Sequence, residues 1–312
     1  MIASLGLRRR ALISCLLAAA VVLSPAGVAL RPARGATSGI GLERAHAHND
    51  YEHERPLHDS IDRGFKSVEA DIYLVGDQLL IGHDPADLQP GRTLQSLYLN
   101  PLRKRVRNNG GSVYRGDRHY FSLLIDVKTE AVSTYLRLDE VLANYRSILT
   151  RFGNEDVTEK AVTAIVSGNR ARPLMESQIV RYAFYDGRLS DLGTGAAQSL
   201  IPLISDNWMN NFTWDGTGPM PEAEREKLHS IVAVAHADGQ RVRFYATPDQ
   251  PGPEREAIWK ELMEARVDYL NTDDLSGLRS FLLANDPRPA VPYVNFGAGG
   301  AKLAIVRAKS AA

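Results

Sequence analysis

The strand and helix pattern of this chain constrains its fold more than any other feature. Eight short apolar runs alternate with segments in which apolar residues recur every three or four positions. The runs are Leu42–Ala47, Ser67–Leu74, Tyr120–Val127, Ala161–Val166, Arg181–Tyr185, Ser199–Ile204, Arg241–Ala246 and Val267–Asn271, and the helical segments include Leu136–Thr150, Pro221–Ala237 and Pro253–Ala265. Eight strands with helical crossovers in about 240 residues predict an α/β fold, a single (β/α)8 TIM-type barrel. A doubly wound open sheet is the competing fold.

The first 36 residues differ from the rest of the chain in composition. Arg8-Arg9-Arg10 precedes an apolar run from Ala11 to Leu23, which Pro25 ends. This order is typical of an export signal peptide, with cleavage expected between residues 29 and 36. An uncleaved anchor helix is the alternative, although the run is shorter than the ~20 residues that span a bilayer. We therefore expect a secreted or periplasmic protein with a signal peptide at 1–36, one barrel domain at 37–287 and a tail at 288–312.

The charge balance argues against nucleic acid as a partner. The chain holds 37 basic and 37 acidic residues, but five of the arginines and none of the acids fall in residues 1–36, so the remainder has a net charge of −5. Its one cysteine, Cys15, lies in the same N-terminal stretch. The predicted barrel therefore has no disulfide, thiol nucleophile or cysteine zinc site. The sequence shows no basic amphipathic helix that would indicate membrane contact. Membrane contact and the oligomeric state both stay open.

Two histidines close the first predicted strand. In an extended chain His46 and His48 lie on the same face, because side chains alternate with a period of two. The carboxyl ends of barrel strands are where such a fold assembles its active site. We therefore expect the pair to point into one space, the alternative being that one of them only packs or caps a neighbour.

The second predicted strand brings two carboxylates to one face. Glu69 and Asp71 alternate with Val68, Ala70 and Ile72, which would face the helices. Two adjacent carboxylates in a partly desolvated cavity repel each other unless a cation compensates. A hard divalent cation, Mg²⁺ or Ca²⁺, suits oxygen ligands, so the pair predicts a metal site. An ordinary ion pair with Lys or Arg is the alternative.

Further polar residues follow the later strands. His83 and Asp84 end a short extended piece, and the third strand closes on Asp126 and Lys128. Asp126 is positioned to complete a three-carboxylate metal site, and Lys128 to hold an anion. Other candidates for substrate contact at the strand ends are Asn169, Arg170, Trp208 and Tyr245. Turn and helix-cap roles are the alternative for several residues at these ends.

The order of these residues resembles that of a known superfamily. His46, Glu69-x-Asp71, Gly82-His83-Asp84, Asp126-x-Lys128 and Thr272-Asp273 together resemble the glycerophosphodiester phosphodiesterase and phosphatidylinositol phospholipase C-like superfamily. The run from His46 to Tyr51, followed by Arg55-Pro56-Leu57 and Gly64-Phe65, is similar to its secreted branch of altered-inheritance-of-mitochondria-protein-6-like proteins. The resemblance extends over residues 42 to 284.

The resemblance implies a (β/α)8 barrel that hydrolyses a small-molecule or lipid phosphodiester with a divalent metal and two histidines. His46 and His83 match the acid/base pair, and Glu69 and Asp71 match two metal ligands. Asp126 stands where the family usually has glutamate.

One departure from the family pattern leaves two assignments open. The family's His-Arg-Gly is replaced by His46-Ala47-His48, so the arginine that would contact the phosphate is missing. Arg170 or Lys128 is expected to take its place. His48 also competes with His46 for the catalytic role, with His46 favoured by its position along the strand.

Two other functions compete with this interpretation. A His-x-His pair at the end of the first strand is also typical of metal hydrolases of the amidohydrolase type and of the polymerase-and-histidinol-phosphatase type. Those sites need later histidines at strand ends, whereas His229 and His236 fall in a predicted helix. A non-catalytic secreted binding barrel is the other alternative.

Overall fold

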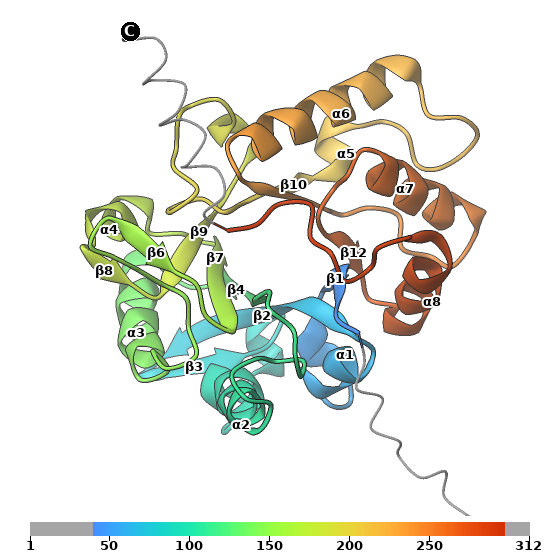
Figure 1. Ribbon diagram of the computed structural model, residues 1–312. Helices are drawn as coiled ribbons and strands as arrows, with labels where there is room; N and C mark the ends of the chain where they lie inside the picture. Colours follow the sequence, from blue (N-terminus) through green and yellow to red (C-terminus); the bar gives the residue numbers. More distant parts are fainter. Residues whose placement is uncertain (1–39, 297–312) are drawn as a thin grey trace, which may run out of the picture. The chain divides into compact units, whose positions relative to one another are not determined.

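Eight parallel strands form a closed barrel in residues 40–296, the part of the chain that the computed structural model describes (Figure 1). They are β1 (Leu42–Ala47), β2 (Phe65–Val75), β4 (Phe121–Val127), β7 (Val162–Gly168), β9 (Ala183–Gly187), β10 (Leu203–Asn207), β11 (Arg241–Tyr245) and β12 (Leu270–Thr272). Hydrogen bonds join them in the order β11-β10-β9-β7-β4-β2-β1-β12. A parallel bridge between Arg243 and Tyr269 closes the ring. The predicted (β/α)8 barrel is confirmed, and the open sheet is excluded.

Helices cover the outside of the barrel (Figure 1). They are α1 (His58–Asp62), α2 (Asn100–Asn108), α3 (Ala131–Ala143), α4 (Arg172–Ser177), α5 (Trp208–Asn211), α6 (Glu222–Ala237), α7 (Pro253–Glu264) and α8 (Leu275–Asn285). Short antiparallel additions are β3 (Gln78–Ile81), which pairs with β2, and the small sheet of β5 (Arg151–Gly153), β6 (Asp156–Thr158) and β8 (Val180–Arg181). Among the described helices none is long and apolar enough to cross a bilayer.

The sequence pattern places several elements a few residues away from their observed bounds. The helix expected at Leu136–Thr150 begins at Ala131, because the Glu130 side chain accepts hydrogen bonds from Val132 N and Ser133 N and caps the first turn. Contrary to the expectation from the sequence, the fold contains a basic amphipathic helix, because α2 has an apolar buried side and a basic outer side. The predicted signal peptide lies outside the described residues.

The first residues of the predicted tail close the amino-terminal end of the barrel. Buried Arg44 on β1 forms an ion pair with Asp286 and donates to the main-chain oxygens of Arg288 and Val291. Phe296 packs edge-on against the rings of Tyr120 and Phe184. The amino-terminal end of the barrel is thus covered. A functional site is therefore expected at the carboxyl end.

Removing the partner of Arg44 tests this packing. Asp286→Ala leaves the Arg44 guanidinium buried without its carboxylate, so we expect the free energy of unfolding to fall by about 3–5 kcal/mol. Urea denaturation measures the change, with Glu226→Ala on the exposed side of α6 as the control, expected within about 0.5 kcal/mol of the parent. A loss below about 1 kcal/mol for Asp286→Ala would show that the ion pair does not hold the tail.

Candidate active site

Three carboxylates converge at the carboxyl ends of β2 and β4. The parallel register sets Asp71 beside Asp126, and Glu69 precedes Asp71 by two residues on the same face of β2. One oxygen of each carboxylate lies within 4.8 Å of the others. The predicted three-carboxylate cluster therefore exists in the fold.

Asp71 is the member of this cluster that has a buried oxygen without a partner within residues 40–296. Its Oδ2 atom accepts from Lys128 Nζ at 2.9 Å and from the Tyr51 hydroxyl at 2.8 Å. Its Oδ1 atom is buried and has no hydrogen-bond partner among the described residues. Burial, and then the neighbouring Glu69 charge, raise the pKa of Asp71 to about 7. An unsatisfied oxygen within an all-oxygen donor set fits a hard divalent cation.

Two cations offset part of the negative charge. Arg243 on β11 donates to Glu69 Oε2 at 2.7 Å and to Asn271 Oδ1. Burial alone would raise the pKa of Glu69, but the Arg243 charge holds that pKa well below its usual value. Burial lowers the pKa of Lys128, but the charges of Asp126 and Asp71 outweigh this effect and raise the pKa to about 12. The Lys128 ammonium therefore stays charged. The cluster therefore has three acids and two permanent cations.

His46 lies beneath the cluster rather than in open space. Its ring is 1% exposed, with Nδ1 2.7 Å from Ser67 Oγ and Nε2 3.4 Å from Glu69 Oε2. Burial, and then the Arg243 charge, lower the pKa of His46 to about 3. The residue favoured by sequence is thus a buried neutral imidazole that supports Glu69.

His48 has the environment of an oriented proton carrier. Its Nδ1 atom is 2.9 Å from Oδ1 of Asp273, the residue directly after β12. Asp273 is itself held in place, because its main-chain N–H donates to Asp249 Oδ2 at 2.7 Å. Burial opposes the shift, but the hydrogen bond to Asp273 and the nearby Glu69 charge raise the pKa of His48. Its Nε2 atom has no hydrogen-bond partner among residues 40–296.

A cavity of about 400 Å³ connects these groups. Its walls are His48, Glu69, Asp126, Val127, Lys128, Ser167, Gly168, Asn169, Arg188, Arg243 and Tyr245. The sequence singled out His48, Glu69, Asp126, Lys128, Asn169 and Tyr245, and the fold brings them together. It missed Arg188 and Arg243. The alternation of Arg241, Val242 and Arg243 was the available signal, because it places arginine on the inner face of a barrel strand.

Comparison with known proteins identifies the families to which this chain is similar. The model of the AIM6-like phosphodiesterase domain matches residues 35–186, and that of the glycerophosphoryl diester phosphodiesterase family matches residues 241–276. Altered inheritance of mitochondria protein 6 of Eremothecium gossypii is 31% identical over 281 residues, which cover 77% of this chain and 69% of that protein. This chain belongs to the altered inheritance of mitochondria protein 6 family. The resemblance deduced from the motifs is confirmed.

Other members of the family and two solved structures are also similar. The homolog of Arthroderma benhamiae is 29% identical over 269 residues, covering 78% of this chain and 85% of that protein. A glycerophosphoryl diester phosphodiesterase from Parabacteroides distasonis aligns with 84% of this chain and 91% of its own, at 12% identity and a TM-score of 0.47. The phosphatidylinositol-specific phospholipase C of Listeria monocytogenes aligns with 78% and 85%, at 10% identity and a TM-score of 0.42.

Besides His46 and Asp71, which lie next to the main cavity without lining it, three further residues predicted for the site, His83, Arg170 and Trp208, lie outside it. His83 is on an exposed loop after β3, 3.3 Å from Asp84, and lines a neighbouring hollow that also includes Tyr51 and Arg92. Arg170 donates to the main-chain oxygen of Asp186 and stacks over Tyr185 instead of reaching the cavity.

Trp208 does not form a substrate wall. It is fully buried, stacks on Phe212 and donates its indole N–H to Trp214 O. The strand that precedes it, β10, ends at Asn207, and α5 turns the indole toward the core.

The charge excess at Asp71 predicts a pH dependence of stability. A carboxyl whose pKa is raised by folding costs stability as it ionises, so that cost grows from about pH 4 to pH 7. In EDTA, Asp71→Asn should therefore gain stability relative to the parent over this range and level off above it. Urea unfolding at each pH measures the difference. A difference that does not change with pH would contradict the charge excess.

Proposed function

We propose that this chain is a metal-dependent phosphodiester hydrolase. The observation that supports this function most directly is the set of three converging carboxylates, one with an unsatisfied buried oxygen, beside Lys128, Arg243 and a cavity of about 400 Å³. The family relationship to a phosphodiesterase domain supports the same reaction class. The composition of residues 1–36 supports action outside the cytoplasm.

The charges of the site favour a phosphodiester over a phosphomonoester. Glu69, Asp71 and Asp126 contribute three negative charges when ionised, and Lys128 and Arg243 contribute two positive charges. A divalent cation, Mg²⁺ or Ca²⁺, held by the three carboxylates would act as a Lewis acid toward the phosphoryl oxygens. The site would then have one net positive charge, which matches the single negative charge of a small-molecule or lipid diester.

His48 is the residue best placed to move a proton in this cavity. Asp273 fixes Nδ1, so Nε2 is the atom that takes the proton from an attacking hydroxyl. The hydrogen bond to Asp273 keeps the imidazole in one orientation, and although burial opposes the shift, this bond and the nearby Glu69 charge raise the pKa of His48. His83 is the candidate for protonating the leaving oxygen, from the loop beside the cavity.

The cavity arginines take the place of the arginine missing from the first motif. Arg243 and Arg188 both line the cavity and can donate to non-bridging oxygens, which Arg170 does not reach. Arg188 is held in position by an ion pair with buried Asp186.

A histidine-based metal site has less support. His46 and His48 each face a different carboxylate, Glu69 and Asp273. The later His229 and His236 lie on α6, outside the barrel. Among the described residues the metal-binding geometry belongs to carboxylates alone.

Hydrolysis of bis(p-nitrophenyl) phosphate and of glycerophosphodiesters tests this function. We expect EDTA to abolish turnover and added Mg²⁺, Ca²⁺ or Mn²⁺ to restore it. His48→Ala should lower kcat about 100-fold or more without changing the melting temperature, because it removes the proton carrier and little packing. His46→Ala should instead lower the melting temperature, since His46 is buried against Glu69.

His229→Ala, on the exposed side of α6, is the matched control and should behave as the parent. Full activity of His48→Ala would remove that residue from the mechanism. Absence of hydrolysis by folded protein with every ion would support the binding-barrel alternative.

A further inference from the structure

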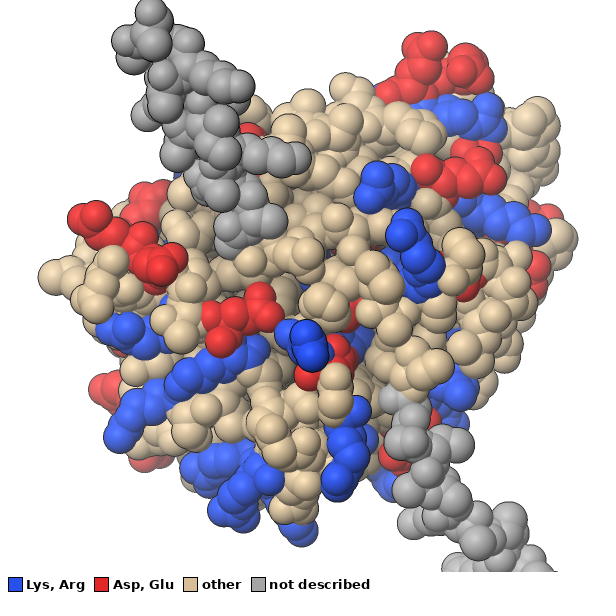
Figure 2. Space-filling model, viewed as in Figure 1, with Lys and Arg blue, Asp and Glu red and all other residues tan. Residues whose placement is uncertain are grey.

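One helix of the barrel has an exposed basic surface that the proposed reaction does not use. Residues 100–119, which form α2 and the loop after it, hold six basic residues and one acidic residue, whereas the rest of 37–312 has 26 basic and 36 acidic residues. Figure 2 shows Lys and Arg side chains gathered over α2. We call the exposed cations of this stretch the α2 surface; they are Arg103, Lys104, Arg107, Arg115 and Arg118.

The cations of the α2 surface are not neutralised by the protein itself. Within residues 40–296 none of the five forms an ion pair, and the one acid of the stretch, Asp117, pairs with Lys66 instead. Half-buried basic residues elsewhere do form ion pairs, as Arg172 does with Glu176 and Asp191. Five unpaired like charges on one surface repel each other, so an external anion would stabilise them.

The apolar side of α2 explains why these cations stay exposed together. Leu102 and Val106 are buried one helical turn apart and fix the orientation of the helix against the barrel. Arg103, Lys104 and Arg107 are then turned outward. The loop after α2 is held as well, because the Tyr114 hydroxyl donates to Phe65 O at 2.6 Å. The exposed Lys and Arg side chains of the α2 surface are therefore attached to a backbone that packing and hydrogen bonds hold in place.

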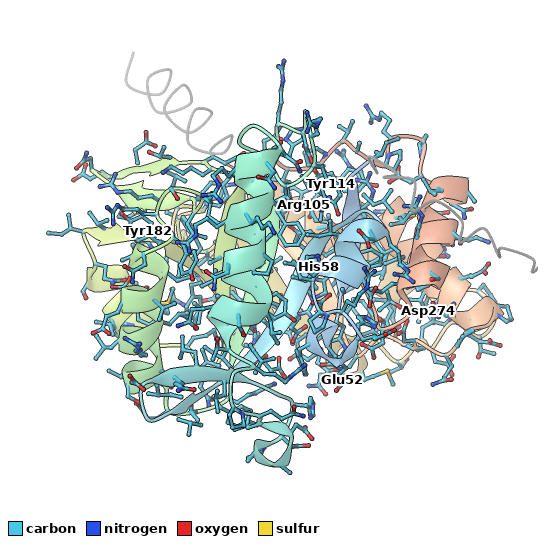
Figure 3. The ribbon with its side chains drawn as sticks, turned by 90° about the horizontal axis from the view of Figure 1, so that it is seen from below. Glu52, His58, Arg105, Tyr114, Tyr182 and Asp274 are labelled. Carbon is cyan, nitrogen blue, oxygen red and sulfur yellow. The ribbon has the colours of Figure 1, made fainter. Side chains whose placement is uncertain are left out.

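The loop part of the α2 surface lies at the opposite end of the barrel from the candidate active site. Tyr114 contacts the beginning of β2, and Arg118 lies three residues before β4 begins, so the loop belongs to the amino-terminal end of the barrel. The carboxylates lie at the opposite, carboxyl end. Figure 3 shows Arg105 and Tyr114 toward one end of the barrel and Glu52 toward the other.

We propose that the α2 surface binds the anionic face of a phospholipid bilayer. Guanidinium groups pair well with phosphate oxygens, and clusters of four or more Lys and Arg residues on a helix attract anionic lipid headgroups. The tyrosines near this stretch, such as Tyr98 and Tyr145, are buried, so no aromatic side chain is exposed to stack on a nucleobase. No large apolar residue is exposed among residues 100–119, so adsorption is electrostatic and without insertion.

Vesicle co-sedimentation of the purified chain tests this proposal. The probes are vesicles of phosphatidylcholine alone and vesicles with about 30 mol% phosphatidylglycerol. We expect at least about tenfold more binding to the anionic vesicles at about 50 mM NaCl, and loss of this preference at about 500 mM NaCl.

Matched triple variants locate the effect. K104A/R107A/R115A should lose most of the preference for anionic vesicles, whereas K227A/K260A/R288A, which removes three exposed cations elsewhere, should retain it. All six side chains are exposed, so both variants should fold as the parent does. Equal binding by the two variants would overturn the proposal, because the N-terminal arginines are the same in both. Tighter binding to duplex DNA than to anionic vesicles at equal salt would also overturn it.

Discussion

The repulsion among three carboxylates, two buried and one half-buried, is the constraint on which the rest of this site depends. Glu69, Asp71 and Asp126 are forced together by the parallel register of β2 and β4. Lys128 and Arg243 offset part of their charge, and Arg243 also binds Asn271, so the same contact links β11 to β12 where the ring closes. A Cβ at position 168 would collide with Asp126 Oδ1, so glycine is required beside the cluster. The protein alone leaves one Asp71 oxygen unsatisfied.

The two ends of the barrel have separate roles. At the amino-terminal end, Arg44 and Arg241 use their charges to bind the main chain of residues 288–294 and close the opening. At the carboxyl end, arginines line a cavity, and Arg243 pairs with the carboxylate of Glu69. The division matches the general behaviour of these barrels, in which one end supplies stability and the other carries function. The α2 surface adds an exposed, unpaired basic region near the first of these ends.

Much of this arrangement could be predicted from the sequence, for identifiable physical reasons. Strand alternation and the convergence of parallel strand ends suffice to bring Glu69, Asp71, Asp126 and Lys128 together. The same rules could not separate His46 from His48, because both share a face and only the closed barrel shows which one reaches the cavity. Trp208 was misplaced because the short α5 turn has no periodic signal. The basic surface was overlooked because α2 contributes few apolar residues to the pattern.

Anomalous X-ray scattering from a Mn²⁺-containing crystal tests most directly whether Glu69, Asp71 and Asp126 form a divalent cation site. The account predicts one anomalous peak about 2.0–2.6 Å from an oxygen of each carboxylate, with the free Asp71 Oδ1 atom among the ligands. The same crystal of Glu69→Gln should show the peak weakened or absent. A parent crystal with no peak between the carboxylates, and with Lys128 as the sole cation on Asp71, would contradict the account.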